Sequence, residues 1–106
     1  FQTGSSNLGE GSFKSLRNLA DFLRSNSTRK VALVGHTDAE GSLEGNIALS
    51  KRRASSVRTR LIEAYGVPAD QLSAEGVGFL SPVASNLSAV GRTANRRVEA
   101  VLISSQ

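Results

Sequence analysis

Hydrophobic residues recur at helical spacing in two stretches of the chain. The first stretch predicts a helix that begins near Ser12. Its apolar residues lie three and four positions apart and so share one face: Phe13, Leu16, Leu19, Ala20 and Leu23, with Phe22 at the flank of that face. Polar residues 24–29 end this pattern. A longer helix is predicted to begin within residues 42–44 and to end near Tyr65, because Gly66 and then Pro68 follow it. Its predicted core stripe is Leu43, Ile47, Ala54, Val57 and Leu61.

Three further stretches have strand character. Residues 31–34 form a continuous apolar run that ends at Gly35, a pattern typical of a central strand buried on both faces. Residues 72–77 and 97–104 predict two more strands, and residues 1–11 the tail of a strand followed by a loop. Residues 78–95 are rich in turn-forming residues and predict a long ordered loop.

This order of elements predicts the fold class. Strands that alternate with helices, followed by a last strand reached through a loop, indicate an α/β (α+β) two-layer sandwich in which two main helices pack on a mixed sheet. At 106 residues, with 39% apolar and 21% charged residues, residues 1–106 make one small domain.

Composition excludes several classes of function. There is no Cys, so disulfides, zinc-thiolate sites and thiol nucleophiles are excluded, and the single His36 argues against a metal site built from several histidines. No apolar run approaches the ~18 residues of a membrane-spanning helix. Because the chain begins at Phe1, we expect a processed or excised fragment whose link to a membrane, if any, lies upstream.

The net charge of +4 favours an anionic partner. Ten of the 13 cationic residues are Arg, whose planar guanidinium suits carboxylates as well as phosphates. A run at residues 51–53 and a cluster of Arg92, Arg96 and Arg97 could bind nucleic acid, but the few aromatic residues offer no platform for stacking bases. Lys51 and Arg52 are better explained as a solvated helix face.

The candidate chemistry lies in the loop after the first complete strand, residues 35–41. Loops at the carboxyl ends of strands are the usual ligand sites of α/β domains, and Asp38 is the focus of this one. On the helix that follows, Asn46, Ser50 and Arg53 form one polar stripe that starts near the loop. If Asp38 and Arg53 converge, they form either a structural salt bridge or a receptor for a zwitterion, in which Asp38 takes an ammonium and Arg53 a carboxylate.

Catalytic interpretations find less support. His36 and Asp38 match no usual metal-ligand spacing, and Ser50 is not framed by the Gly-x-Ser-x-Gly pattern of a nucleophile. We therefore predict no enzyme activity, no cofactor and no metal, and interpret His36 as a loop histidine that satisfies backbone groups.

Several spaced motifs resemble those of one family. They are Gly35-His36-Thr37-Asp38, Gly41, Asn46, Leu49-Ser50, Arg53-Ala54, Gly66-Val67, Gly76-Val77-Gly78, Pro82, Asn86, Gly91-Arg92 and Asn95-Arg96-Arg97-Val98-Glu99. In this order the segment 31–101 resembles the OmpA-like C-terminal domain, the peptidoglycan-binding module of outer-membrane proteins, peptidoglycan-associated lipoproteins and flagellar stator proteins. The resemblance implies a βαβαββ order whose first strand is largely truncated in this chain.

The resemblance also implies a ligand. In that family the aspartate and the arginine that match Asp38 and Arg53 grip the diaminopimelate residue of the peptidoglycan stem peptide, which agrees with the zwitterion receptor. Supporting ligand contacts are implied for Thr37, Asn46, Leu49, Gln2, Thr3 and Gly4. Arg92, Asn95, Arg96 and Arg97 are expected to buttress the pocket rather than to touch ligand.

Two departures from the family pattern affect the pocket. Gly45 stands where an aromatic residue is frequent, and Gln2 where an aspartate is frequent.

From the resemblance as a whole we expect a periplasmic domain that binds peptidoglycan through meso-diaminopimelate and tethers an envelope protein to the wall, with no nucleic-acid partner and with a homodimer left open. The alternative is a periplasmic protein-interaction module that keeps the fold without binding the wall.

Overall fold

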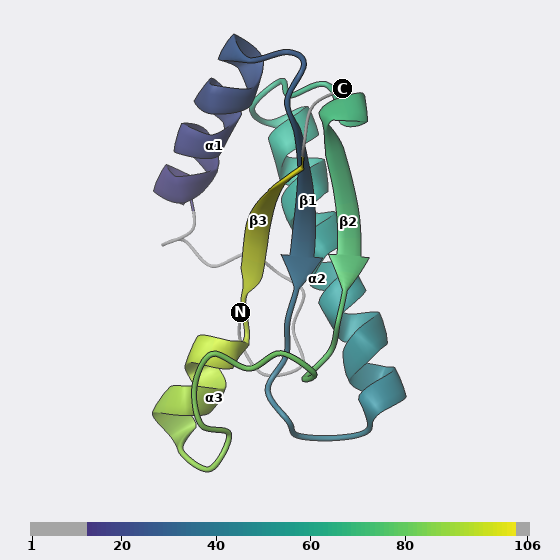
Figure 1. Cartoon of the computed structure of the whole chain (residues 1–106), viewed down its shortest axis with the longest axis vertical. Helices are drawn as coiled ribbons and strands as arrows, with labels where there is room; N and C mark the ends of the chain where they lie inside the picture. Colours follow the sequence, from purple (N-terminus) through teal and green to yellow (C-terminus); the bar gives the residue numbers. More distant parts are fainter. Residues whose placement is uncertain (1–12, 104–106) are drawn as a thin grey trace.

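The computed structural model describes residues 13–103, which form alternating helices and strands (Figure 1). In chain order these are α1 (Phe13–Ser25), β1 (Lys30–Gly35), α2 (Leu43–Glu63), the 3-10 turn η2 (Ala69–Gln71), β2 (Leu72–Gly76), α3 (Ala89–Asn95) and β3 (Val98–Ile103). The two long helices α1 and α2 and the three strands β1, β2 and β3 match the sequence prediction to within a few residues at each end. The predicted strand tail at residues 1–11 lies outside the described residues.

The three strands form one mixed sheet in the order β2-β1-β3. β1 runs parallel to β2, with Val31 opposite Leu72, and antiparallel to β3, with Val31 opposite Leu102. α2 makes the crossover that parallel neighbours require. The predicted central position of β1 is therefore confirmed.

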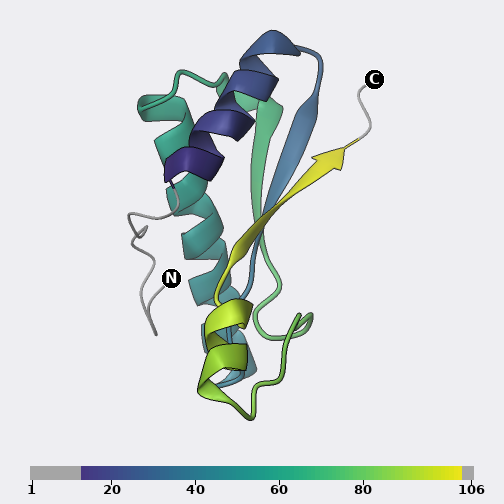
Figure 2. The same cartoon turned by 90° about the vertical axis from the view of Figure 1, so that its left-hand side faces the viewer.

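Both long helices cover one face of this sheet, which gives a two-layer arrangement (Figure 2). The core between the layers is aliphatic and is contributed by α1, α2, the strands and Val67; its buried members are Leu16, Ala20, Leu23, Val31, Leu33, Ala54, Val57, Leu61, Val67 and Leu72. Burying one such leucine side chain stabilises the fold by about 1.5–3 kcal/mol. On β1 the residues facing this core, Val31 and Leu33, are buried, while the alternating Ala32 and Val34 are only half-buried. The opposite face of the sheet is thus more open than predicted.

A buried glutamine ties α1 to the rest of the fold. Nε2 of Gln71 donates to the backbone carbonyls of Leu23, Asn26 and Arg29, each at 3.0 Å. These carbonyls lie at and just beyond the carboxyl end of α1, where helix carbonyls lack intrahelical partners. Gln71 therefore anchors the end of α1 on η2.

Two predictions about the elements are wrong. The turn-rich segment 78–95 ends in a third helix, α3, which is capped by Ser88, whose hydroxyl accepts from the backbone N–H of Gly91. In α2, Leu43 and Ile47 are not core residues but are 38% and 37% exposed. The amino-terminal half of α2 buries its polar stripe instead, as the following section describes.

Candidate functional site

The turn that leaves β1 is fixed from both sides by its backbone. The N–H of His36 donates to the carbonyl of Arg97 at 2.7 Å, and the N–H of Thr37 donates to the carbonyl of Gly78 at 2.9 Å. His36, Thr37 and Asp38 are each at most 4% exposed. The predicted ligand loop therefore begins with three buried residues held between the segment after β2 and the start of β3.

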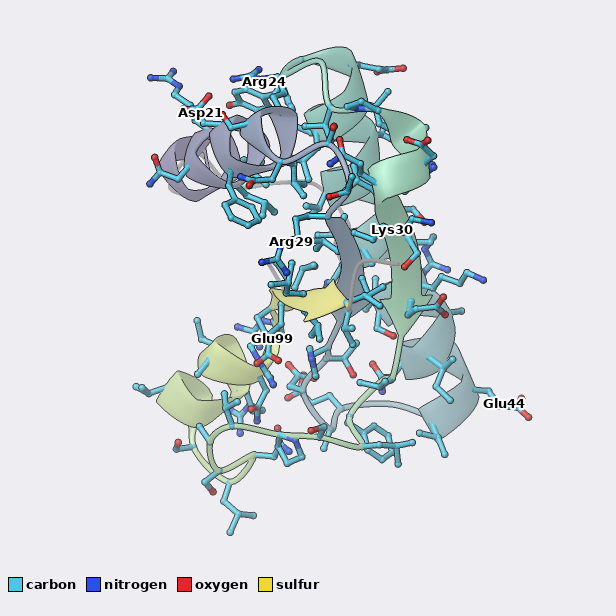
Figure 3. All side chains as sticks on the ribbon, turned by 45° about the horizontal axis from the view of Figure 1, so that its top comes forward. Asp21, Arg24, Arg29, Lys30, Glu44 and Glu99 are labelled. Carbon is cyan, nitrogen blue, oxygen red and sulfur yellow. The ribbon has the colours of Figure 1, made fainter. Side chains whose placement is uncertain are left out.

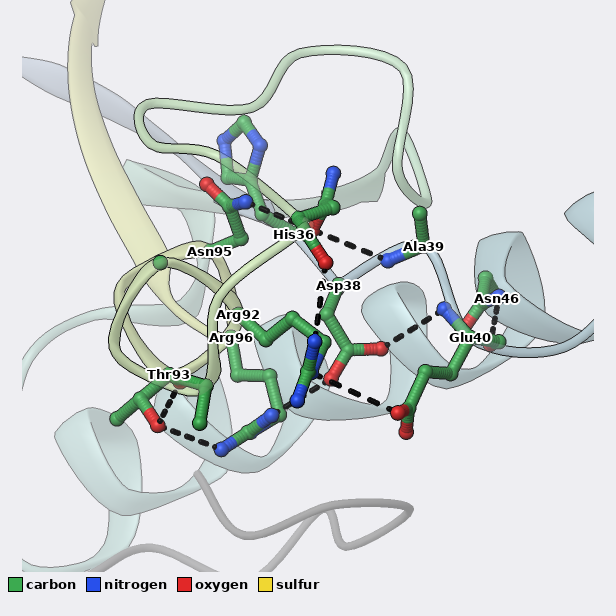
Figure 4. Close-up of polar contacts among 12 residues, drawn as sticks. His36, Asp38, Ala39, Glu40, Asn46, Arg92, Thr93, Asn95 and Arg96 are labelled. Carbon is green, nitrogen blue, oxygen red and sulfur yellow. Dashed lines mark hydrogen bonds and ion pairs between the residues drawn. The ribbon is translucent and has the colours of Figure 1, made fainter.

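Asp38 is a buried carboxylate with both oxygens engaged (Figure 4). Oδ1 accepts from the backbone N–H of Glu40 at 3.1 Å, and Oδ2 pairs with Nη1 of Arg96 at 2.6 Å. Nη2 of Arg96 in turn donates to Oγ1 of Thr93 at 2.9 Å. The carboxylate is thus oriented by one backbone donor and by one guanidinium from the end of α3.

Arg53 is a fully buried guanidinium on α2. Its Nη1 donates to the carbonyl of His36 at 3.1 Å. Burial lowers the pKa of Arg53, the charge of Arg96 lowers it further, and the Asp38 carboxylate opposes both. Because arginine stays protonated even so, Asp38, Arg53 and Arg96 place one negative and two positive charges in a shared electrostatic neighbourhood.

Close backbone packing brings α2 to this turn. A Cβ on Gly35 would lie 1.8 Å from the carbonyl oxygen of Ser50, so only glycine permits this approach. The Ser50 hydroxyl is buried and donates to the carbonyl of Ile47 while accepting from the N–H of Gly78. These bonds give Ser50 a structural role, so that the alternative of a nucleophilic serine has no support.

Asn46 shapes the loop between β1 and α2. Its Nδ2 donates to the carbonyls of Glu40 and Ser42, at 2.7 and 2.9 Å. Leu49, one helical turn further along, is buried but lies outside the main core cluster. The Thr37 hydroxyl is buried and has no hydrogen-bond partner among residues 13–103. It is a donor and acceptor available beside Asp38.

A second network holds the segment before α3 against the site. Asn95 is fully buried; its Oδ1 accepts from the N–H groups of Val83 and Ala84, and its Nδ2 donates to the carbonyl of Ala84 and to Oδ1 of Asn86. Oδ1 of Asn86 also accepts from the N–H of Ala39. The two loops are thereby linked directly.

Arg92 and Arg97 lie at the edges of the same network. Nη1 of Arg92 donates to the carbonyl of Asn86, and its Nε lies 3.6 Å from Oε1 of Glu40. Arg97 binds the Glu99 carboxylate at 2.8 Å and the carbonyl of Ser81 at 3.1 Å. Asn95, Arg92 and Arg97 thus brace the loops, as predicted, whereas Arg96 reaches the Asp38 carboxylate itself.

The His36 side chain does not satisfy backbone groups, contrary to our interpretation. Neither ring nitrogen has a hydrogen-bond partner in the described part of the chain, and Nε2 lies 3.7 Å from Oε2 of Glu99. Burial lowers the pKa of His36 and the Arg97 charge lowers it further, while Glu99 and the backbone of Ser81 oppose them. It is the main chain of His36, not its ring, that organises the turn.

Among the described residues, Gly45, Lys51 and Arg52 are exposed on α2. Gln2, Thr3 and Gly4 lie outside the described residues. Gly45 is exposed in the first turn of α2, where its N–H donates to the Ser42 hydroxyl. Lys51 and Arg52 are exposed, as expected of a solvated face. Within residues 13–103 no group of three or more acidic or histidine side chains could hold a metal ion.

The Arg96–Asp38 pair is the contact that sequence reasoning missed. The two residues are 58 positions apart, and the sequence places Arg96 only within a cationic cluster. The run of Asn95, Arg96 and Arg97 does not indicate which arginine points toward the turn. Only the packing of α3 against the loop reveals it.

Comparison with known proteins gives consistent matches. The model of the OmpA family matches residues 1–96. The chain is 42% identical over 100 residues to outer membrane porin F of Pseudomonas aeruginosa, covering 94% of this chain and 29% of the relative. It is 40% identical over 90 residues to the peptidoglycan-binding protein ArfA of Mycobacterium tuberculosis, covering 85% of this chain and 27% of the relative. The chain thus spans less than a third of either relative.

A solved structure shows the same fold. The peptidoglycan-associated lipoprotein from Burkholderia pseudomallei superposes with a TM-score of 0.91 at 31% identity, covering 97% of this chain and 86% of that one. None of the helices described here is long and apolar enough to cross a membrane.

Proposed function

The chain belongs to the OmpA family, and from this premise we propose that it binds peptidoglycan non-covalently through the diaminopimelate residue of the stem peptide. The family is one of binding domains rather than enzymes. In the proposal Asp38 takes the ammonium of the free end of meso-diaminopimelate, and Arg53 takes its carboxylate.

One observation carries this proposal: opposite charges lie buried together at the carboxyl end of β1. Asp38 is 4% exposed and Arg53 is not exposed at all. Taking charges out of water costs several kcal/mol per ion, and well-packed apolar residues often stabilise a fold as well as a buried ion pair does. A ligand that carries both charges would use such a site directly, through charge-assisted hydrogen bonds of about 1.5–3 kcal/mol each.

The neighbouring residues have roles that fit this ligand. The Thr37 hydroxyl can bond to an ammonium or a carboxylate, Asn46 fixes the loop that carries Asp38, and Leu49 offers an apolar wall. Gln2, Thr3 and Gly4 are proposed as further contacts. The matched relatives named as an outer membrane porin and a peptidoglycan-associated lipoprotein support a periplasmic domain that tethers an envelope protein to the wall.

Co-sedimentation with purified sacculi tests the proposal. Asp38→Asn keeps the shape of the side chain and an acceptor for the N–H of Glu40, but it removes the charge that the ammonium needs. We expect it to weaken binding at least tenfold, since truncating one partner of a buried charge pair costs about 2–5 kcal/mol. Lys51→Ala, which removes an exposed charge from α2, is the matched control and should bind as the wild type does.

The outcomes separate the two functions considered for this fold. A folded wild-type domain that stays in the supernatant would contradict wall binding and would support a protein-interaction module instead. Wild-type sedimentation by Asp38→Asn would show that the wall is bound elsewhere on the domain. Thermal unfolding followed by circular dichroism establishes that each variant is folded.

A further inference from the structure

The main chain of the loop that follows Asp38 is not held by burial. Residues 36–38 are buried, but every residue from 39 to 45 is exposed. Exposed loop residues have little apolar packing to fix their position, so their hydrogen bonds define it. The bonds to Ala39 and Glu40, directly after Asp38, therefore determine where the candidate ligand loop lies.

These bonds come from both sides of the loop. On the α2 side, the carbonyl of Glu40 accepts from Nδ2 of Asn46 at 2.7 Å. On the α3 side, the N–H of Ala39 donates to Oδ1 of Asn86 at 3.2 Å. The N–H of Glu40 donates to Oδ1 of Asp38, so the direction of that carboxylate depends on the position of the main chain at residues 39–40.

Asn86 is itself fixed by the segment that leads into α3. Its Oδ1 accepts a second bond, from Nδ2 of Asn95 at 2.9 Å, and its carbonyl accepts from Nη1 of Arg92 at 3.1 Å. Asn95 is fully buried and is also bonded to the backbone of residues 83–84. In Figure 4, Ala39 and Asn95 lie on either side of this link. Asn86 thus ties the exposed loop to a segment whose own position is fixed by a buried side chain.

We propose that Asn86 is a positioning residue for ligand binding, which holds the main chain at Ala39 in the binding conformation without touching the ligand. The inference rests on the proposed function, because it concerns the same loop. Without the Asn86 oxygen the loop has more conformations in the free protein, and this freedom is lost when a ligand binds. Affinity therefore falls although Asp38 and Arg53 are unchanged.

Two substitutions separate the hydrogen bonds of Asn86 from the rest of its side chain. Asn86→Ala removes the oxygen that accepts from Ala39 and Asn95. Asn86→Asp keeps an oxygen at the same place, and a carboxylate oxygen can accept both bonds. Ser85→Ala is the matched control, because its hydroxyl accepts from the N–H of Leu87, a bond that stays within residues 85–87.

The test combines affinity with the protection of one amide. Isothermal titration calorimetry with a meso-diaminopimelate stem peptide gives the dissociation constants, and NMR hydrogen exchange of the free proteins gives the protection of the Ala39 N–H. In Asn86→Ala we expect the dissociation constant to rise about tenfold and exchange at Ala39 to accelerate by a similar factor, since one or two hydrogen bonds are lost. Asn86→Asp and Ser85→Ala should stay within about threefold of the wild type in both measurements. Exchange in α1 should be unchanged, which a general loss of stability would not allow.

Other outcomes contradict the inference in distinguishable ways. Faster exchange at Ala39 with wild-type affinity in Asn86→Ala would overturn it while the proposed function stands. An equal loss of affinity in Asn86→Ala and Asn86→Asp would overturn it as well, because only the second variant keeps the acceptor. If the folded wild type does not bind the peptide, the proposed function fails and the inference fails with it.

A change on the other side of the bond keeps the inference testable if Asn86→Ala loses the structure of α3. Replacement of the Ala39 amide by an ester removes the donor and leaves Asn86 bonded to Asn95. We expect the same rise in the dissociation constant for this variant, and wild-type affinity would contradict the inference.

Discussion

The residues that define this site are buried charges rather than exposed ones. Arg53 reaches from α2 to the carbonyl of His36, and Asp38 is held by the N–H of Glu40 and by Arg96. Each polar group has a backbone partner that fixes its direction. If the proposed ligand binds here, side chains held in this way would lose little conformational entropy on binding. Figure 3 shows, by contrast, Asp21, Arg24 and Glu44 on the outer surface of the helices.

At the same scale, His36 predicts a dependence of stability on pH. Its pKa in the folded protein is lowered by burial and by Arg97. The unfolded chain, in which histidine titrates near an ordinary pKa of about 6.5, therefore binds a proton more readily than the folded protein does. The free energy of unfolding should therefore keep its full value above about pH 6.5 and should decrease as the pH falls below this value.

Urea unfolding at pH 7.5, 6.5 and 5.5 measures this dependence. We expect the free energy of unfolding to fall over this range in the wild type and to fall less in His36→Gln, which cannot be protonated. Glu99, whose pKa is lowered by its hydrogen bond from Arg97, loses its contribution only at lower pH. Equal slopes for the wild type and His36→Gln would rule out the histidine as the source.

Single residues also show what the sequence can and cannot predict. The strand-loop-helix pattern places Asp38 near a polar stripe of the next helix that starts at Asn46 and includes Arg53, but it leaves open whether Asp38 and Arg53 converge; in the structure Arg53 reaches the carbonyl of His36 in the same turn. The partnership of Arg96 with Asp38 was not predicted, because it depends on how α3 packs 58 residues later. The His36 ring was assigned hydrogen bonds that it does not make, since sequence says nothing about which loop atoms face a side chain.

At the scale of elements, α2 combines two functions along its length. Its carboxyl-terminal half buries Ala54, Val57 and Leu61 in the core, as the apolar spacing predicts. Its amino-terminal half buries Asn46, Ser50 and Arg53 against the turn after β1, which leaves Leu43 and Ile47 partly exposed. The apolar stripe mispredicts this half because hydrogen bonds to a loop, rather than apolar contact, decide which face is buried there.

The helix α3 was missed for a related reason. It has seven residues, too few to show a helical period, and it lies in a segment dominated by turn-forming residues. Its position depends on Gly91, where a Cβ would lie 1.7 Å from the carbonyl oxygen of Ser85, and on the bonds of Asn95 to residues 83–86. These are tertiary constraints that a local pattern does not express.

The anchoring of α1 gives a prediction for an element. Gln71→Leu retains much of the side-chain volume but removes the amide that binds the carbonyls of Leu23, Asn26 and Arg29. The carbonyls of Leu23 and Asn26 keep one backbone donor each, but all three carbonyls lose the Gln71 amide, so we expect the free energy of unfolding to fall by about 1–3 kcal/mol. Hydrogen exchange should show the loss of protection concentrated in α1.

The adjacent Asp70→Ala is the control for this change. Asp70 is exposed in the same 3-10 turn, so that its removal should alter stability by no more than about 0.5 kcal/mol. If Gln71→Leu left the protection of α1 unchanged, α1 would be held by its apolar face alone.

At the scale of the whole molecule, the candidate site and α1 lie toward opposite ends of a shape 41 Å long (Figure 1). The core between the helices and the sheet stabilises the fold, while the turn after β1, the first turns of α2 and the region of α3 form the site at the other end. Changes in the site should therefore alter binding with little effect on α1. The net charge of +4 supplies long-range attraction to anionic material, but the proposed recognition of diaminopimelate resides in the buried side chains of Asp38 and Arg53.

The most direct test of the central claim is an NMR titration of the domain with a stem peptide that contains meso-diaminopimelate, beside one that contains lysine. We predict selective chemical-shift changes at Thr37, Asp38, Asn46 and Arg53 with the diaminopimelate peptide, no comparable changes with the lysine peptide, and unchanged signals from α1. Well-dispersed spectra of a folded domain that respond to neither peptide, or that respond equally to both, would contradict the account.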